Sequence, residues 1–163
     1  MNTITEYFSG ERLQCLIGIV ISSISIAFAL YFLLQVKTEF YKGIAWPFII
    51  ISLLLLSICI GVVWRTPHDI ERVTNYTIYE KEKVSLEEIP RMQGVLQNFK
   101  IIKVFELSLL LIGIGIVLFA SAKGNSLLKG IGLGLVIQSA IMFGFDYFAH
   151  ERGKVYFEFL QNL

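Results

Sequence analysis

Four long apolar segments, separated by short polar stretches, dominate the pattern along the chain. They cover residues 13–36, 44–64, 101–122 and 127–148, each close to the roughly 20 residues that carry a helix across about 30 Å of hydrocarbon. The third reaches that length only when residues 101–105 are included. In lipid, only helices and closed β-barrels pair all backbone amides, and the segments lack the two-residue alternation of barrel strands. They therefore predict an all-α, polytopic membrane protein, a four-transmembrane-helix bundle in one membrane domain, 1–163.

Composition supports this interpretation. The chain is 55% hydrophobic and only 17% charged, with a mean hydropathy of +0.68, which is too apolar for an ordinary water-soluble domain. The first segment is too long for a cleavable signal peptide, and Glu6, Glu11 and Arg12 make its N-terminal flank not clearly basic. No small-residue cleavage pattern follows it, so it is expected to remain as a membrane span.

The basic residues predict the orientation. With four spans, ten Lys and Arg residues fall on the face that carries both termini, and four fall on the opposite face. Basic residues are retained in the cytoplasm during insertion, so we expect an integral protein, of a bacterial inner membrane, with both termini cytoplasmic. The net charge of +1, with acids interleaved among the bases, gives no support to a nucleic-acid partner.

Polar segments at 65–100 and 146–163 predict a small cytoplasmic cap. Thr66 and Pro67 have the form of a helix start, with Thr66 as the N-cap, and the following short helix is expected to end near Asn75. Residues 75–86 partly alternate, which predicts an extended or hairpin-like piece, and Ser85 begins a second capping pattern. The apolar stripes that extend spans three and four are expected to pack together in the cap; the alternative is that they dock a partner.

Small and polar residues indicate how the spans pack. Gly113 and Gly115 in the third span and Gly130 and Gly134 in the fourth allow close helix contact, and the short connection between these spans predicts a tight antiparallel hairpin. Gly130 and Gly134 form a GxxxG pair, for which packing within the monomer is favoured over dimerisation. Gln138, near mid-membrane, is expected to hydrogen-bond to a neighbouring helix.

One charged residue lies near the inner end of each span: Arg12, Arg65, Glu106 and Asp146. Partly desolvated charges need opposite partners. If all four helices cross at similar depth, these residues predict an ion-pair layer that fixes helix depth and order.

A sharper hypothesis adds both histidines to this layer. Asp146 and His150 share a helix face, and together with His68, Asp69 and Glu106 they could supply imidazole and carboxylate ligands to a divalent metal. Such a site could activate water at the membrane surface. The spacing is common in ordinary helices and the stronger metal motifs are missing, so no cofactor is expected beyond this candidate metal.

Three functions remain open. The leading hypothesis is a non-catalytic integral membrane protein that acts by helix packing or partner binding, as an accessory, scaffold or neutralising subunit. It would associate with the lipid bilayer and, through the cap, with a protein partner or further copies of itself as a homo-oligomer. The alternatives are an oligomeric channel or small-solute carrier lined by Gln138 and serines, and a metal-dependent membrane hydrolase. No ionisable residue falls in the middle of a span, which disfavours an ion-coupled transporter.

Overall fold

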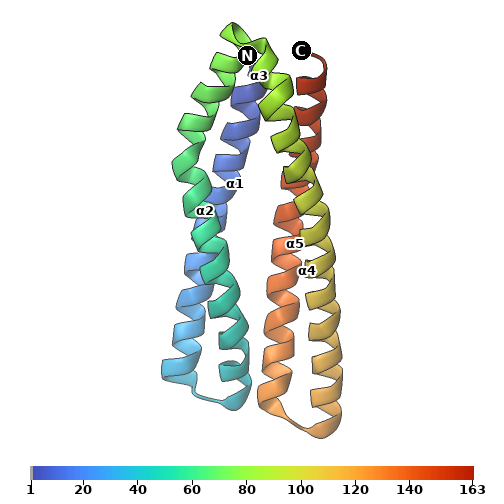
Figure 1. The fold of residues 1–163 in the computed structure, drawn as a ribbon. Coiled ribbons are helices and arrows are strands. Elements are labelled where there is room, and N and C mark those ends of the chain that lie inside the picture. The colour runs from blue at the N-terminus through green and yellow to red at the C-terminus, as the bar shows by residue number, and fades with distance from the viewer. Residues whose placement is uncertain (1) are drawn as a thin grey trace.

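Every element of the protein is helical. The computed structural model describes residues 2–163 and contains no strand among them. Figure 1 shows two long antiparallel hairpins side by side, with both chain ends at the same end of the bundle. In order, the elements are α1 (Asn2–Tyr31), the π-helical turn η1 (Phe32–Val36), α2 (Glu39–Tyr79), α3 (Lys81–Lys83), the π-helical turn η2 (Val84–Glu88), α4 (Ile89–Lys123) and α5 (Ser126–Gln161).

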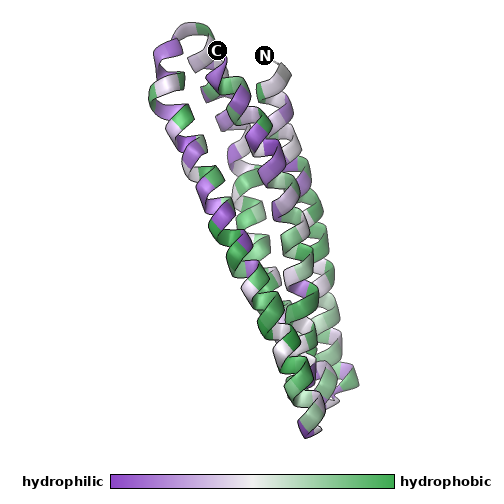
Figure 2. Cartoon of the chain, turned by 90° about the vertical axis from the view of Figure 1, so that its right-hand side faces the viewer, coloured by the Kyte–Doolittle hydropathy of each residue, from purple (hydrophilic) through white to green (hydrophobic). Residues whose placement is uncertain are grey.

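The predicted all-α fold with four membrane helices is confirmed. Each apolar segment lies within one of four helical stretches that are long and apolar enough to cross a membrane. The helices are longer than a span requires: α2 has 41 residues, or about 60 Å at 1.5 Å per residue. Figure 2 shows the apolar residues along most of the bundle and hydrophilic residues gathered at the end that carries the termini. We call this end, residues 2–11, 65–100 and 146–163, the charged end.

The predicted helix start at Thr66 is wrong. Helix α2 runs through Thr66 and Pro67 without interruption, and the Thr66 hydroxyl donates to the Val62 carbonyl oxygen at 2.7 Å, not to an N-terminal amide. Continuing an existing helix adds a hydrogen bond for each residue fixed, whereas a new helix must first be nucleated. A threonine inside a helix can satisfy its hydroxyl on the carbonyl four residues earlier.

The extended piece predicted for residues 75–86 is also wrong. Helix α2 continues to Tyr79, Glu80 makes the turn, and α3 and η2 are helical from Lys81 to Glu88. The Ser85 hydroxyl donates to the Glu82 carbonyl oxygen at 2.8 Å, so it does not cap a helix. The partial alternation of this stretch therefore belongs to a short, mostly exposed helical crossover, in which Val84 is the one buried residue.

Helix α5 is the centre of the packing. Its backbone approaches those of α4, α2 and α1 closely, whereas within residues 2–163 the α4 backbone approaches neither α1 nor α2. Side chains alone bridge α4 to α1 at the charged end, where the Arg91 guanidinium lies 5.9 Å from the centre of the Phe8 ring. A Cβ atom on Gly130 would overlap the Phe40 carbonyl oxygen, and one on Gly132 would lie 2.8 Å from the Gly113 carbonyl oxygen. Glycines therefore let α5 approach both neighbours at backbone distance. Gly134 lies against Ile44, but a Cβ on Gly115 would meet no atom within 4 Å.

Gly124 makes the sharp connection between α4 and α5. Its φ of +67° lies in the left-handed region, which glycine enters at little cost. The Asn125 side chain then accepts a hydrogen bond from the Leu128 amide at 3.0 Å and caps α5. This two-residue turn fixes the register of the α4–α5 hairpin.

A compact apolar core holds the charged end together. The Tyr7 and Tyr156 rings stack with their centroids 4.2 Å apart, which joins the start of α1 to the end of α5. Residues 65–100 and 146–163 therefore pack on each other as continuations of the membrane helices, and the start of α1, which the sequence did not suggest, completes the core. Its buried members are Ile4, Tyr7, Phe8, Val73, Val84, Met92, Tyr156 and Leu160.

Candidate functional site

A buried pair of acidic side chains lies where α4 and α5 leave the apolar part of the bundle. The Lys103 ammonium donates to His150 Nδ1 at 2.9 Å, and one turn nearer to the membrane centre Glu106 of α4 faces Asp146 of α5. Glu106 is only 2% exposed. Neither of its carboxyl oxygens receives a hydrogen bond from an N–H or hydroxyl group in residues 2–163.

The arrangement of this pair is costly for an isolated protein. A carboxylate removed from water needs donors or an opposite charge, and two adjacent carboxyl groups disfavour each other's charged form. The positive charge of Lys103 is close enough to act on both carboxyl groups, but its ammonium is hydrogen-bonded to His150 and not to either acid. The pair therefore has unused capacity to accept a proton, a cation or a hydrogen-bond donor.

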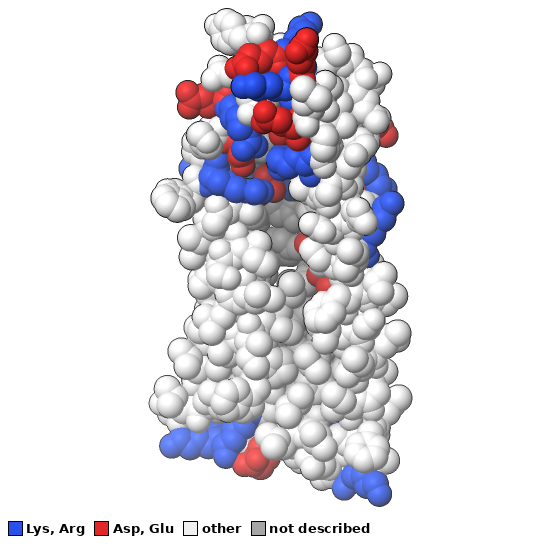
Figure 3. All heavy atoms as spheres, viewed as in Figure 1, with Lys and Arg blue, Asp and Glu red and all other residues white. Residues whose placement is uncertain are grey.

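A hollow opens close to this level of the bundle. Figure 3 shows it between the α1–α2 hairpin and the α4–α5 hairpin, just below the charged end, with acidic atoms beside it. Glu106 and Asp146 are the only acidic residues in the sequence between 89 and 150. At this level the backbones of α2 and α4 do not approach each other, so the bundle is open along this seam.

The four residues of the predicted charge layer are not brought together. Arg65 pairs with Glu11 at 3.2 Å and approaches Asp69 at 3.6 Å. Arg12 is exposed and takes part in no ion pair within residues 2–163. Only Glu106 and Asp146 of the four meet, and both are acidic, so they form no ion pair.

The five metal candidates do not meet at one site. His68 is exposed, Asp69 is bound by Arg72 at 2.9 Å, and His150 accepts the Lys103 bond. Glu106 and Asp146 form the pair described above. Within residues 2–163, no group of three or more His, Cys, Asp and Glu side chains is placed to hold a metal ion.

His150 is held in its neutral form by its surroundings. Burial lowers its pKa below the ordinary value, and the charges of Lys103 and Lys154 lower it further, against a smaller opposing effect of Glu151. Because an ammonium only donates, Nδ1 must be the acceptor and the ring proton sits on Nε2. His150 is therefore a buried acceptor that anchors α4 to α5.

Sequence reasoning missed the strongest polar cluster, which is centred on Glu88. This carboxylate is 1% exposed; it accepts two hydrogen bonds from Arg91 at 2.8 and 2.6 Å and one from the Tyr156 hydroxyl at 3.0 Å. Arg72 of α2 lies 3.8 Å away. Burial and the charge of Glu88 raise the pKa of Tyr156. The cluster joins α2, η2, α4 and α5, and its only signal in the sequence is the three-residue spacing of Glu88 and Arg91.

Gln138 has a partner on a neighbouring helix, as predicted. Its side-chain amide donates to the Ser52 hydroxyl of α2 at 3.1 Å, and the two side chains are 2% and 1% exposed. This bond ties α5 to α2 inside the apolar part of the bundle.

Comparison with known proteins finds no matching family model, no similar curated protein and no similar solved structure. The fold and its apolar surface define a polytopic helical membrane protein.

Proposed function

We propose that the protein is a non-catalytic membrane subunit that binds a transmembrane helix of a partner protein along the seam between α2 and α4. The observation that carries this proposal is the open seam: the α4 backbone approaches α5 but neither α1 nor α2, and a hollow remains there, below the side-chain core of the charged end (Figure 3). The partner helix would take the position that closes the bundle.

Chemistry favours a helix over lipid in this position. Acyl chains offer no hydrogen-bond donor, so against lipid Glu106 would have only the neighbouring Asp146 carboxyl group as a partner. A helix with Lys or Arg near its inner end would bring a cation to the Glu106–Asp146 pair, and charged groups within membrane helices are normally paired in this way. Asp146 is only partly buried and is the carboxyl group through which such a partner would approach.

The charge distribution supports placing both termini and the charged end in the cytoplasm. Ten of the fourteen Lys and Arg residues belong to this end and the span ends next to it, as expected for the retained side of a membrane protein. The partner's basic residue would then lie near the cytoplasmic end of its own span.

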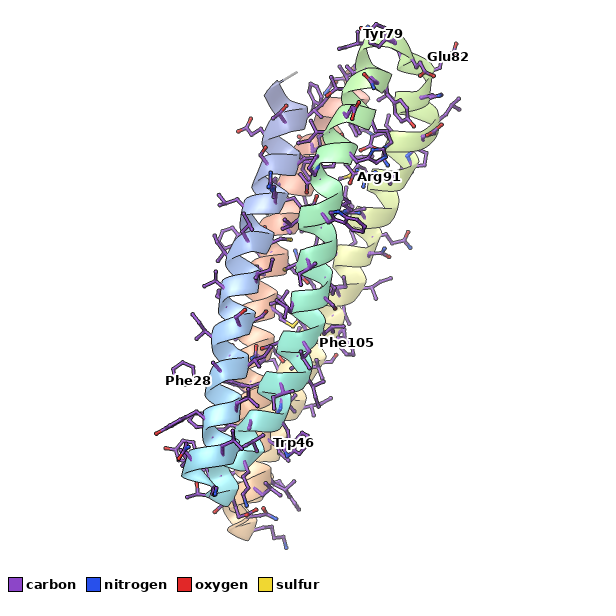
Figure 4. The ribbon with its side chains drawn as sticks, turned by 90° about the vertical axis from the view of Figure 1, so that its left-hand side faces the viewer. Phe28, Trp46, Tyr79, Glu82, Arg91 and Phe105 are labelled. Carbon is purple, nitrogen blue, oxygen red and sulfur yellow. The ribbon has the colours of Figure 1, made fainter. Side chains whose placement is uncertain are left out.

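Site-specific photocrosslinking tests the proposal in native membranes. Phe105 of α4 and Phe28 of α1 are 61% and 54% exposed and lie on opposite sides of the view in Figure 4, so they form a matched pair of probe sites. With p-benzoylphenylalanine in place of Phe105 we expect one discrete protein adduct, and in place of Phe28 we expect none. Glu106→Gln should weaken the Phe105 adduct, whereas Glu151→Gln, a change at an exposed ion pair with Lys154, should not.

Two outcomes would contradict the proposal. Lipid adducts alone from both probe sites would show that the seam is an ordinary lipid-facing surface. An adduct with twice the mass of the chain would identify a second copy of this protein in the seam, without any basic partner helix.

The buried carboxyl pair also favours a second candidate, a carrier that couples a small solute to a proton. Protonatable groups buried near one end of a bundle recur in such proteins. Purified protein in liposomes would then move protons or solute, and Glu106→Gln would abolish that flux. Unchanged flux in this variant would exclude the pair from transport.

A further inference from the structure

A second open feature lies between α1 and α5, away from the α2–α4 seam. It is a groove of about 630 Å³ that is open along one side. Its walls are almost entirely apolar, and its polar side chains, Gln14 and Arg152, come from the side of the charged end. The main apolar contributors are Leu13, Ile17, Ile141, Phe145 and Phe148.

Arg152 is positioned by neutral groups and has no anion beside it. Its guanidinium donates to the Gln14 side-chain oxygen, and the Gln14 amide donates to the Phe145 carbonyl oxygen. The Nε atom is buried and bonds to no acceptor within residues 2–163. Arg152 also forms no ion pair there, although most other arginines at the charged end do.

Gly10 makes room for this guanidinium. A Cβ atom on Gly10 would lie 2.9 Å from Arg152 Cδ, so a larger residue would push the arginine away from α1. Gly144, in contrast, faces open space, since a Cβ there would meet no atom within 4 Å. The groove is therefore narrow beside the arginine and open beside the apolar wall.

We propose that the groove binds one anionic phospholipid, with its phosphate on Arg152 and one acyl chain along the apolar wall. Arg152 is placed where the apolar part of the bundle meets the charged end, which is the level of lipid headgroups. A guanidinium recognises phosphate oxygens in a fork geometry, and anionic lipids are attracted to basic residues at the cytoplasmic surface. From Arg152 the wall runs toward the membrane centre, as an acyl chain does.

The lipid site is independent of the partner proposed for the other seam. It requires only that the helices cross a membrane, so the two proposals can fail separately.

Native mass spectrometry of the detergent-solubilised protein, after exchange with phosphatidylglycerol or phosphatidylcholine, tests the site. We expect the wild type to retain one phosphatidylglycerol molecule with about ten-fold preference over phosphatidylcholine, as one charge-assisted bidentate contact would give. Arg152→Gln should lose this preference. Arg12→Gln removes an exposed arginine near the same end of α1, outside the groove, and should keep it.

A second variant keeps the test independent of whether Arg152→Gln folds. Gly144→Leu places a side chain into the open groove and should reduce retention of both lipids without disturbing a helix contact. A wild-type preference in Arg152→Gln would overturn the proposal, as would full retention in Gly144→Leu. Equal losses in Arg12→Gln and Arg152→Gln would assign the preference to general surface charge and overturn it as well.

Discussion

Replacing Glu88 with glutamine should destabilise the charged end more than any other change of one charged side chain there. The carboxylate accepts two bonds from Arg91 and one from Tyr156, and it is almost completely buried. Breaking a buried ion pair costs about 3–5 kcal/mol. Arg91 keeps 26% of its side chain exposed and an amide oxygen can still accept one bond, so we expect a loss of about 2–3 kcal/mol.

The neighbouring residue supplies a matched control. Glu87 is exposed and accepts a bond from Tyr76 at 2.7 Å, so Glu87→Gln should change stability by less than about 0.5 kcal/mol. Unfolding would be followed by titrating a mild detergent solution with dodecyl sulfate and recording the near-ultraviolet circular dichroism of the stacked tyrosines. Equal effects of the Glu87 and Glu88 changes would refute this view of the cluster.

A double-mutant cycle sharpens the experiment. Tyr156→Phe removes one hydrogen bond to a charged acceptor and should cost about 1.5 kcal/mol. Because both residues share this bond, the double variant should lose at least about 0.5 kcal/mol less than the sum of the single losses. Strict additivity would mean that Glu88 and Tyr156 do not interact in the folded protein.

Three further predictions concern the helix contacts. Gly130→Ala should lower the free energy of unfolding by about 1–3 kcal/mol in the same titration, because the added Cβ would overlap the backbone of α2. Gly115→Ala, whose Cβ would face open space, should leave it unchanged, and similar effects of the two changes would contradict the contact at Gly130. Gln138→Leu should cost about 0.6 kcal/mol and no more than about 1.7, and a larger loss would point to a wider polar network. The pKa of His150 is lowered in the folded state. Its contribution to the free energy of unfolding is therefore complete above about pH 6.5 and is lost as the pH falls through the folded pKa. His150→Gln should remove that part of the acid sensitivity, and an unchanged stability profile from pH 7 to 5 would refute the role of His150.

The membrane helices could be predicted because lipid leaves the backbone few choices. Each apolar segment had to be helical, and each is. The helix boundaries were less predictable, because residues that favour a helix N-terminus, such as Thr and Pro, can also lie inside a helix that continues from the preceding residues. At Thr66 the hydroxyl donates to the Val62 carbonyl oxygen, and α2 continues without a break.

The site was only partly predictable, because pairing depends on register. The sequence placed Glu106 and Asp146 at one level, and the short turn at Gly124 and Asn125 puts them at similar distances from the turn on facing helices. That they face each other, with the arginines elsewhere, follows from the rotation of each helix, which glycine contacts set. The Glu88 cluster depends on four elements meeting in space, and the sequence carries little trace of it.

Reporter fusions test the central claim, four membrane crossings with the charged end in the cytoplasm, most directly. Alkaline phosphatase, which is active only outside the cytoplasm, would be inserted at Asn125 between α4 and α5 or fused after Leu163, with green fluorescent protein after Leu163 as the complementary reporter. We predict an active phosphatase at Asn125, an inactive one after Leu163 and a fluorescent C-terminal fusion, since basic residues keep that end inside. An active phosphatase after Leu163, or an inactive one at Asn125 in a stably inserted protein, would contradict the claim.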